Sequence, residues 1–279
     1  GRLRTPFYKY SDFKDVGYAY DWLRVPQGVY GLGFDTIEGL TFYRTAQLGS
    51  LDSTLQLIFG GYDGDASLSG VQVNATIDNV AGITWELAKD SLSARFAYLT
   101  GKTSIETAPV SLAPGFTVGN LYQALTANGL APVVEAIDID DESSNFIGVG
   151  LTYDDSNWIA VAEYTRVEVE NSFISIQKNW YASIGKRINS FTPYISYERE
   201  NNDAVVSIYQ PYSSVLPPQL LVPLQGLVAT QERDASTWNV GLRYDFHPSA
   251  AFKAQFSSED LDTTGQRNGV LAFGVDLIF

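Results

Sequence analysis

The sequence contains no cysteine and only one histidine, and these scarcities exclude several kinds of chemistry. Without cysteine, the 279-residue chain has no disulfide, no thiolate metal ligand and no cysteine nucleophile. A single histidine, His247, leaves few ways to build a Ser–His pair or a histidine metal site. No serine has a catalytic partner that the sequence can place, and no phosphate-binding glycine loop stands out. We therefore expect a protein that is not an enzyme.

Long apolar runs and clustered basic residues are also missing. No stretch approaches the roughly 18 to 20 consecutive apolar residues of a membrane-spanning helix. The net charge of -14 argues against a nucleic-acid partner, because phosphate binding needs clustered Lys and Arg. Residues Gly1–Pro6 have neither the apolar core nor the cleavage site of a secretory signal peptide, so we expect the chain to begin as a mature protein or as a fragment.

What the sequence does contain is alternation of apolar and polar residues. The final segment, Asn268–Phe279, alternates large apolar residues with small or polar ones, and Thr237–Phe246 does so more clearly still. A period of two predicts strands that are apolar on one face only. Strands of about ten residues are the length that a membrane-spanning β-strand needs.

Twelve such segments follow one another along the chain. They are Arg2–Lys9, Gly39–Leu48, Ser53–Gly60, Val80–Ala88, Leu92–Gly101, Asn145–Tyr153, Asn157–Val169, Phe173–Arg187, Phe191–Glu200, Thr237–Phe246, Ala250–Glu259 and Asn268–Phe279. Short turns alternate with longer polar connections, of which Tyr10–Glu38, Tyr62–Asn79, Lys102–Ser144 and Asn201–Arg233 are the longest. Long structureless loops are uncommon in compact soluble domains, whereas outer-membrane barrels have short turns at one rim and long loops at the other.

These features predict an all-β fold, a transmembrane antiparallel β-barrel that forms a single domain over residues 1–279, with long outer loops and short periplasmic turns. Aromatic residues near the predicted strand ends would form the girdles found at bilayer interfaces. They are Trp158, Trp180, Tyr181, Trp238, Tyr244, Phe246 and Phe279. A soluble β-sandwich would bury alternating aromatics equally well, and it is the alternative.

At this point the chain resembles the Gram-negative trimeric general porins. The resemblance rests on the terminal F-G-V-D-L-I-F, on the alternation of short turns and long loops, and on the first 48 residues. Gly1–Tyr8 looks like a mid-barrel strand whose inward arginines form a porin's basic ladder, and Tyr10–Glu38 (residues 10–38) looks like the constriction loop that folds into the lumen. The resemblance implies a location in the outer membrane, contact with lipid and lipopolysaccharide, a homotrimer, and no cofactor.

The resemblance also implies a strand number. In porins of this kind the constriction loop follows the fifth of sixteen strands, so the twelve strands seen here would be the fifth to the sixteenth. Four strands and a signal peptide would then precede Gly1. A complete barrel of twelve strands remains open as an alternative, since bacterial barrels take even strand numbers from 8 upward.

A pore of about sixteen strands has an aqueous lumen, and its selectivity depends on its size and on the charges that line it. A charge on the lipid face at the midplane costs about 2 to 4 kcal/mol, so we assign the wall arginines to the lumen. The basic candidates are Arg2, Arg4, Arg95 and Arg243, with Arg44 on a strand whose faces do not separate cleanly; the acidic candidates are Asp12, Asp15, Asp21, Asp35 and Glu38. We predict a transverse field between the two sets; the alternative is local ion pairs without influence on passage.

An acidic run in a predicted outer loop is a candidate for binding Ca²⁺. Its carboxylates are Asp138, Asp140, Asp141 and Glu142. Hard cations favour such oxygen ligands, but the run lacks the spacing of an EF-hand loop, and a solvated acidic run is the alternative. Leu121–Leu125 in the same loop has the composition of a short helix.

The predicted function is a passive channel for small hydrophilic solutes and ions in the outer membrane of a Gram-negative bacterium. Small and polar residues on the inward faces, such as Gly148, Ser196 and Gly241, favour open space. The alternatives are a plugged barrel that acts as an adhesin or receptor through its outer loops and, less favoured, an outer-membrane hydrolase. The sequence does not indicate the preferred solute, the ion selectivity or any voltage gating.

Overall fold

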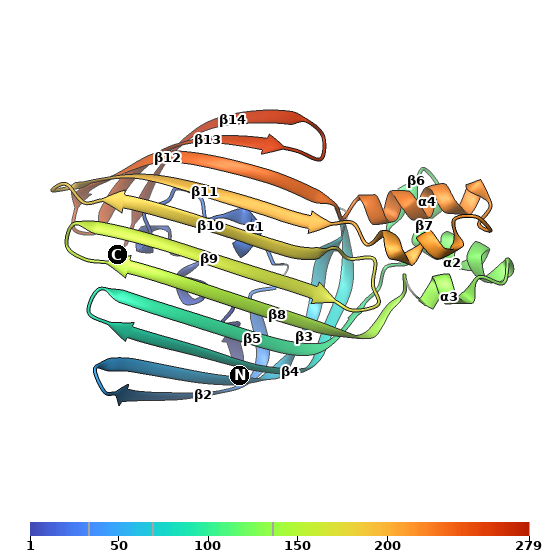
Figure 1. Cartoon of the computed structure of the whole chain (residues 1–279), viewed down its shortest axis with the longest axis horizontal. Helices are drawn as coiled ribbons and strands as arrows, with labels where there is room; N and C mark the ends of the chain where they lie inside the picture. The colour runs from blue at the N-terminus through green and yellow to red at the C-terminus, as the bar shows by residue number, and fades with distance from the viewer. Residues whose placement is uncertain (33, 69, 136, 279) are drawn as a thin grey trace.

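The protein is described by a computed structural model that covers residues 1–32, 34–68, 70–135 and 137–278. Over this part of the chain, twelve antiparallel strands form one large sheet in which every strand pairs with its neighbours in sequence order. The sheet curves into a deep trough (Figure 1). Its strands are β1 Arg2–Arg4, β2 Thr36–Leu48, β3 Leu51–Leu68, β4 Val71–Lys89, β5 Leu92–Ile105, β8 Ile139–Asp154, β9 Trp158–Val169, β10 Ile176–Lys186, β11 Phe191–Asp203, β12 Arg233–His247, β13 Ala250–Leu261 and β14 Gln266–Leu277.

Each of the twelve predicted segments overlaps one of these strands, so the all-β prediction is confirmed. Most boundaries differ from the prediction, because most strands extend beyond the predicted ends. The first strand ends at Arg4 rather than Lys9, and the predicted long connection Tyr62–Asn79 is wrong, because β3 and β4 continue through it as a hairpin. This extension has aspartates on its strands and carries no apolar outer face, so alternation did not reveal it. The terminal aromatic Phe279 lies outside the described residues.

The outer face of the sheet is apolar and exposed, whereas the inner face carries polar side chains beside a cluster of buried apolar ones. Leu40 is 75% exposed and Phe273 is 63% exposed, although both lie in the middle of paired strands. Inward neighbours such as Gln56, Thr84 and Asn239 are buried and polar. An apolar surface that follows the strands around the sheet is too large for a soluble monomer. No second sheet covers this face in the described part of the chain, which excludes the β-sandwich.

The sheet is open along one side. β1 pairs with β2 through three residues, and β14 pairs with β13, but no pairing joins β1 to β14 among the described residues. A closed barrel of twelve strands is therefore not what these residues form.

Two long connections fold together beyond one end of the strands, as a helical cap (Figure 1). The cap contains β6 Ser111–Ala113, β7 Phe116–Thr117, α2 Val118–Ala127, α3 Ala131–Glu135 and α4 Pro218–Ala229. The predicted helix at Leu121–Leu125 is confirmed within α2, where Thr117 and Asn120 form a capping box. Leu121 and Leu125 of α2 are fully buried with Leu224 of α4. None of the described helices has the length and apolar character needed to cross a bilayer.

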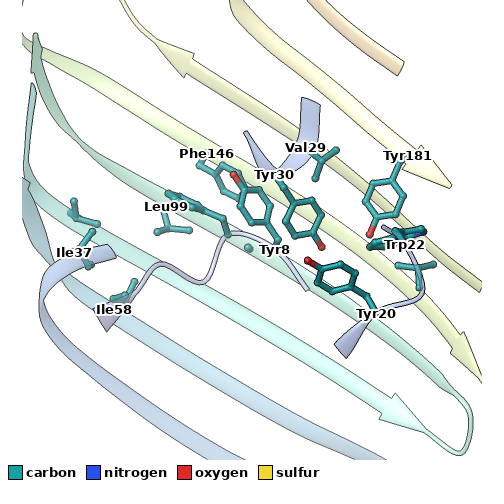
Figure 2. Packing of buried hydrophobic residues seen from close by; sticks show 14 of the residues in the cluster. Tyr8, Tyr20, Trp22, Val29, Tyr30, Ile37, Ile58, Leu99, Phe146 and Tyr181 are labelled. Carbon is teal, nitrogen blue, oxygen red and sulfur yellow. The ribbon is translucent and has the colours of Figure 1, made fainter. Parts of the chain in front are cut away.

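The connection between β1 and β2 runs inside the trough instead of outside it. We call residues 5–35 the interior segment; it contains three short helices, η1 Ser11–Phe13, η2 Gly17–Ala19 and α1 Gln27–Tyr30. Its aromatic side chains pack against rings and aliphatic groups of the wall (Figure 2). The constriction loop predicted at residues 10–38 therefore begins earlier and ends earlier, because β2 starts at Thr36.

Candidate functional site: a clamped segment inside the barrel

Buried aromatic rings hold the interior segment against strands β8 to β10. The ring of Trp22 meets the ring of Tyr181 edge-on at 5.2 Å between centroids, and the rings of Tyr8 and Tyr30 lie 4.5 Å apart. The indole nitrogen of Trp22 also donates to the hydroxyl of Ser183 at 3.0 Å. Full burial of a large apolar side chain is worth roughly 1.5 to 3 kcal/mol, so these rings favour the docked position strongly.

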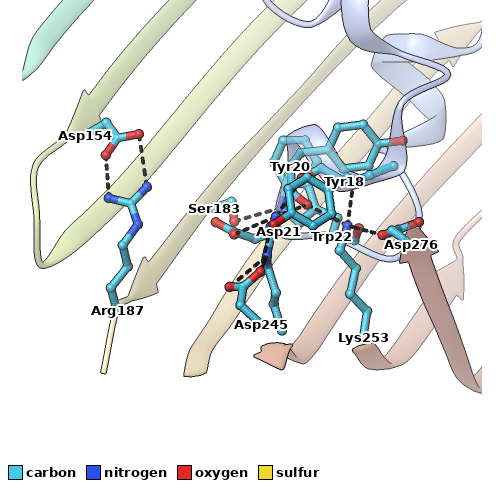
Figure 3. Close-up of polar contacts among 12 residues, drawn as sticks. Tyr18, Tyr20, Asp21, Trp22, Asp154, Ser183, Arg187, Asp245, Lys253 and Asp276 are labelled. Atoms are coloured by element: carbon cyan, nitrogen blue, oxygen red, sulfur yellow. Dashed lines mark hydrogen bonds and ion pairs between the residues drawn. The ribbon is translucent and has the colours of Figure 1, made fainter. Parts of the chain in front are cut away.

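A fully buried lysine on β13 clamps the middle of the segment (Figure 3). The ammonium group of Lys253 donates to the carbonyl oxygens of Gly17 at 2.6 Å, Tyr20 at 2.6 Å and Trp22 at 2.9 Å. Its charge is balanced by the carboxylate of Asp276 on β14 at 2.9 Å. A buried cation is tolerated only when it is paired and hydrogen-bonded, and Lys253 meets both conditions.

Arg243 on β12 holds the same turn of the segment from the neighbouring strand. One guanidinium nitrogen donates to the carbonyl oxygens of Tyr18 at 2.8 Å and Tyr20 at 3.1 Å, and the group lies 4.7 Å above the ring of Tyr18. Arg243 also forms ion pairs with Asp245 at 2.8 Å and with Asp21 at 3.8 Å. The prediction that Arg243 points inward is therefore confirmed, and it contacts one of the predicted acids of the segment.

Asp21 is a largely buried acid within this cluster. Burial raises the pKa of the Asp21 carboxyl above its usual range, and the positive charge of Arg243 opposes the rise without cancelling it. The docked segment thus holds a proton on Asp21 more readily than an ordinary surface aspartate would.

A second anchor is a buried acid of the wall, Glu163 on β9. Its carboxylate accepts hydrogen bonds from the backbone nitrogen of Lys9 at 2.8 Å, from the Tyr181 hydroxyl at 2.5 Å and from the Tyr30 hydroxyl. Burial, together with the charge of Glu163, raises the pKa of Tyr30 well above its usual value, so that the phenol remains a donor. An acid of the wall and a phenol of the segment are thereby joined.

The remaining predicted charges of the segment have separate partners. Arg4 pairs with Asp15, and Lys14 pairs with Asp35 at 2.7 Å within the segment itself. Arg95 on β5 points inward as predicted and donates to the carbonyl oxygen of Pro6 at 2.6 Å. Three of the four acids in the segment therefore face cations by direct contact, whereas Asp12 shares a cavity with Arg95.

Four of the predicted pore-lining residues lie on the other face of the sheet. Arg2, Arg4 and Glu38 are in register with one another and share the face of β2 that carries Leu40, whereas Ile37 points into the interior cluster. Arg44 lies further along that same outward face. The inward assignment of Arg2, Arg44 and Glu38 is therefore wrong. Arg4 shares their face of the sheet, but it is the last residue of β1, and its guanidinium group pairs with Asp15 of the interior segment, so the predicted contact between Arg4 and an acid of the segment is present.

Two cavities lie on opposite sides of the interior segment along the strand direction. The cap-side cavity has a volume of about 570 Å³ and is lined by Phe7 and Phe34 of the segment and by the cap-proximal part of β5. The turn-side cavity has a volume of about 470 Å³ and is lined by Lys9 and Asp12 of the segment and by Arg95 of β5. The interior segment therefore separates the two ends of the lumen.

The acids of the outer-loop run make separate contacts with neighbouring side chains. Asp140 accepts from Ser104 at 3.2 Å, Asp141 lies 3.9 Å from the ammonium of Lys102, and Glu142 accepts from Asn171 at 3.0 Å. In the described part of the chain, no three acids or histidines are grouped as metal ligands. Asp138 is exposed beside this run.

His247 is the last residue of β12, directly before the turn to β13, and is exposed. Its Nδ1 atom lies 2.9 Å from the hydroxyl of Ser249 in the same turn. Both groups are on a hairpin of the short-turn rim, and the Pro248 carbonyl oxygen of this turn accepts a hydrogen bond from the Tyr18 hydroxyl of the interior segment at 2.9 Å.

Sequence reasoning missed Lys253 and Glu163, the two buried charges that hold the segment. Lys253 belongs to the polar face of a strand that alternation identifies, so its inward direction was available from the sequence, whereas Glu163 lies on Asn157–Val169, which does not separate cleanly into two faces. Their partners Tyr20 and Lys9 are more than 150 positions away in the chain, and only the folded structure brings them together.

Comparisons with known proteins find similarity of structure but not of sequence. No protein-family model and no curated protein sequence matches the chain. The outer-membrane channel DcaP of Acinetobacter baumannii is 10% identical with a TM-score of 0.56, and the match covers 99% of this chain and 69% of that one. OmpT expressed in the outer membrane of Vibrio cholerae is 12% identical with a TM-score of 0.56, over 99% and 75% of the two chains.

OmpF of Salmonella typhi, solved in complex with daunomycin, is 14% identical with a TM-score of 0.57, and the match covers 100% of this chain and 73% of that one. Similarity at such low identity establishes the fold. The chain has the β-barrel fold of Gram-negative outer-membrane porins.

Proposed function

We propose that this protein is an outer-membrane channel through which small hydrophilic solutes and ions diffuse passively. The observation that carries the proposal is the position of the interior segment, which crosses the lumen between the two cavities and is fixed to the wall by Lys253, Arg243 and Glu163. A segment held in this way sets the width of the path between the two ends.

The distribution of charge supports a water-filled path. Asp12 and Asp15 are exposed on the interior segment, while Arg95 lines the same cavity as Asp12 from the wall. Ionised groups on opposite sides of a lumen produce a transverse field, and polar solutes exchange hydration for interactions with such a lining.

The open side of the sheet bears on the size of the pore. In a bilayer, an unpaired strand edge leaves N–H and C=O groups without partners, so β1 and β14 need pairing there. We infer that further strands join β14 to β1 and complete a barrel of sixteen, the number that the resemblance to general porins implies. A lumen of that size is wide enough for an aqueous channel.

Planar-bilayer recording of the full-length protein tests the channel. We expect discrete conductance steps whose size increases when residues 11–19 are deleted, because that stretch contains the clamped turn. Wild-type protein without steps refutes the open channel. If the deletion variant alone conducts, the barrel is plugged by its own segment, and the adhesin or receptor alternative replaces the channel.

We further propose that the protein is not an enzyme, needs no cofactor and assembles as a homotrimer in contact with lipid and lipopolysaccharide. The exposed apolar face of the sheet, including Leu40 and Phe273, is available for both lipid and a neighbouring barrel. Native mass measurement in detergent distinguishes a trimer from a monomer, and a monomer overturns the assembly.

A further inference from the structure

The cap-side cavity has a lining that is unusual for the inside of an outer-membrane barrel. Barrel interiors of this class are polar. Here a row of aromatic rings runs along one side, with 4.6 Å between the centroids of Phe146 and Phe7, 5.3 Å between Phe7 and Phe34, and 5.2 Å between Phe34 and Tyr62. Aliphatic side chains, among them Ile77 and Leu99, complete the lining.

Charge is scarce in this cavity. Asp65 is the one carboxylate among its described lining residues, and none of these residues is a lysine or an arginine. Uncharged polar groups are present, including the amide side chains of Gln72, Asn145 and Gln177. The turn-side cavity is different, because Lys9, Asp12, Glu86 and Arg95 all line it. The two ends of the lumen therefore present different chemistry to a solute.

We propose that the cap-side cavity is a binding site for an uncharged aromatic ring carried by an amphipathic solute. Its volume of about 570 Å³ lies within the range of small-molecule pockets, roughly 300 to 1,000 Å³. The ring stacks edge-on or offset against the aromatic row, and the polar part of the solute stays with the amides and in water. The site requires nothing charged on the ligand, because the lining has no cation to pair with an anion.

The position of this site couples binding of the ring to the passage of solutes through the lumen. Phe7 and Phe34 line the cavity and belong to the interior segment, so a bound ring rests directly on the element that narrows the lumen. A solute held there is positioned beside the constriction, and its occupancy obstructs ions. The effect of this site on solute passage rests on the proposed channel function, whereas the binding of the ring does not.

Calorimetric titration of the full chain in lipid nanodiscs tests binding without requiring conduction. The probes are phenyl β-D-glucoside, which carries a ring, and methyl β-D-glucoside, which does not. Burial of one ring corresponds to roughly a 10- to 100-fold gain in affinity, so we expect the phenyl compound to bind tighter by at least about tenfold. Equal affinities for the two glucosides refute the site.

Two cavity variants and one control locate the binding. Ala75 is buried and lines the cavity, so Ala75→Phe fills it and should reduce the affinity for phenyl glucoside to that for methyl glucoside. Phe34→Leu removes one ring of the row with less change in volume and should weaken binding several-fold. Thr54→Phe places the same bulk in the turn-side cavity and should leave the affinity unchanged.

The outcomes separate the two proposals. A folded Ala75→Phe protein that keeps wild-type affinity, or a loss that is equal in Thr54→Phe, overturns the ring site. Bilayer recording tests the channel separately. If the protein conducts but binds the two glucosides equally, the channel proposal stands and the ring site is refuted. If the protein binds the ring but does not conduct, the ring site stands and the channel proposal is refuted.

Discussion

Replacing Lys253 with methionine should release the interior segment while leaving the barrel intact. The methionine retains most of the length of the side chain but removes the charge and three donors. The carbonyl oxygens of Gly17, Tyr20 and Trp22 and the carboxylate of Asp276 then lose their shared partner. Removing one member of a buried pair costs about 3 to 5 kcal/mol, because the other members remain buried without compensation.

The lost free energy should weaken docking of the segment and leave the sheet stable, since Lys253 makes its side-chain contacts with the segment and with Asp276. A loss of about 3 kcal/mol changes the ratio of docked to undocked segment by more than about 100-fold. We expect faster amide hydrogen exchange over residues 17–22 and larger, noisier conductance steps in planar bilayers. Circular dichroism should still show the strand content of the wild type.

The matched control is Lys178→Met. Lys178 on β10 pairs with Asp203 at 3.2 Å, and both side chains are largely exposed. Exposed pairs contribute about 0.2 to 1 kcal/mol, so exchange over residues 17–22 and conductance should match wild type. The reasoning is refuted if folded Lys253→Met protein exchanges and conducts like wild type, or if the control behaves in the same way as the Lys253 variant.

Three further predictions follow from the same contacts. Arg4→Ala should shift the reversal potential toward cation selectivity at low salt, where screening is weak, because Arg4 pairs with Asp15 of the segment. Arg2→Ala should cause no such shift, because Arg2 bonds to Thr36 and pairs with no acid of the described segment. Equal shifts in the two variants would contradict the register. Glu163→Gln should lower the free energy of unfolding by about 1 to 3 kcal/mol in thermal melts, since three donors lose a charged acceptor. The control Glu168→Gln should lower it by less than about 1 kcal/mol. Similar losses in the two variants would show that Glu163 does not anchor the segment. Because the pKa of Asp21 is raised in the docked state, docking should strengthen and conductance should fall as the pH decreases toward the ordinary aspartate pKa of about 4. An Asp21→Asn variant that keeps this dependence would show that another group causes it.

The strands and their faces could be predicted from the sequence alone. Thr237–Phe246 alternates so regularly that β12, its outward Trp238 and its inward Arg243 were all identifiable. This works because the side-chain period of a strand is two, and because a bilayer and an aqueous lumen demand opposite chemistry on its two faces. Alternation becomes uninformative where one of these demands disappears, as in the hairpin of β3 and β4 beyond the apolar band.

Alternation was also insufficient at the first strand. β1 has only three residues, and the chain leaves the sheet at Thr5, so its parity is fixed by pairing with β2 and not by its own pattern. The register that places Leu3 opposite Ile37 turns Arg2 outward, although an arginine-rich strand suggested the reverse. A one-residue shift moves every side chain to the other face, and three residues are too few to exclude that shift.

Only the tertiary structure decided how the interior segment is held. The sequence showed a long acidic and aromatic connection, and the resemblance to general porins implied that this connection enters the lumen. The clamp joins Lys253 to carbonyl oxygens more than 230 positions away, and the acceptors are backbone atoms that every residue possesses. The amino-acid sequence does not predict which carbonyl groups will surround a buried ammonium group, because that depends on the path of the backbone in the folded barrel.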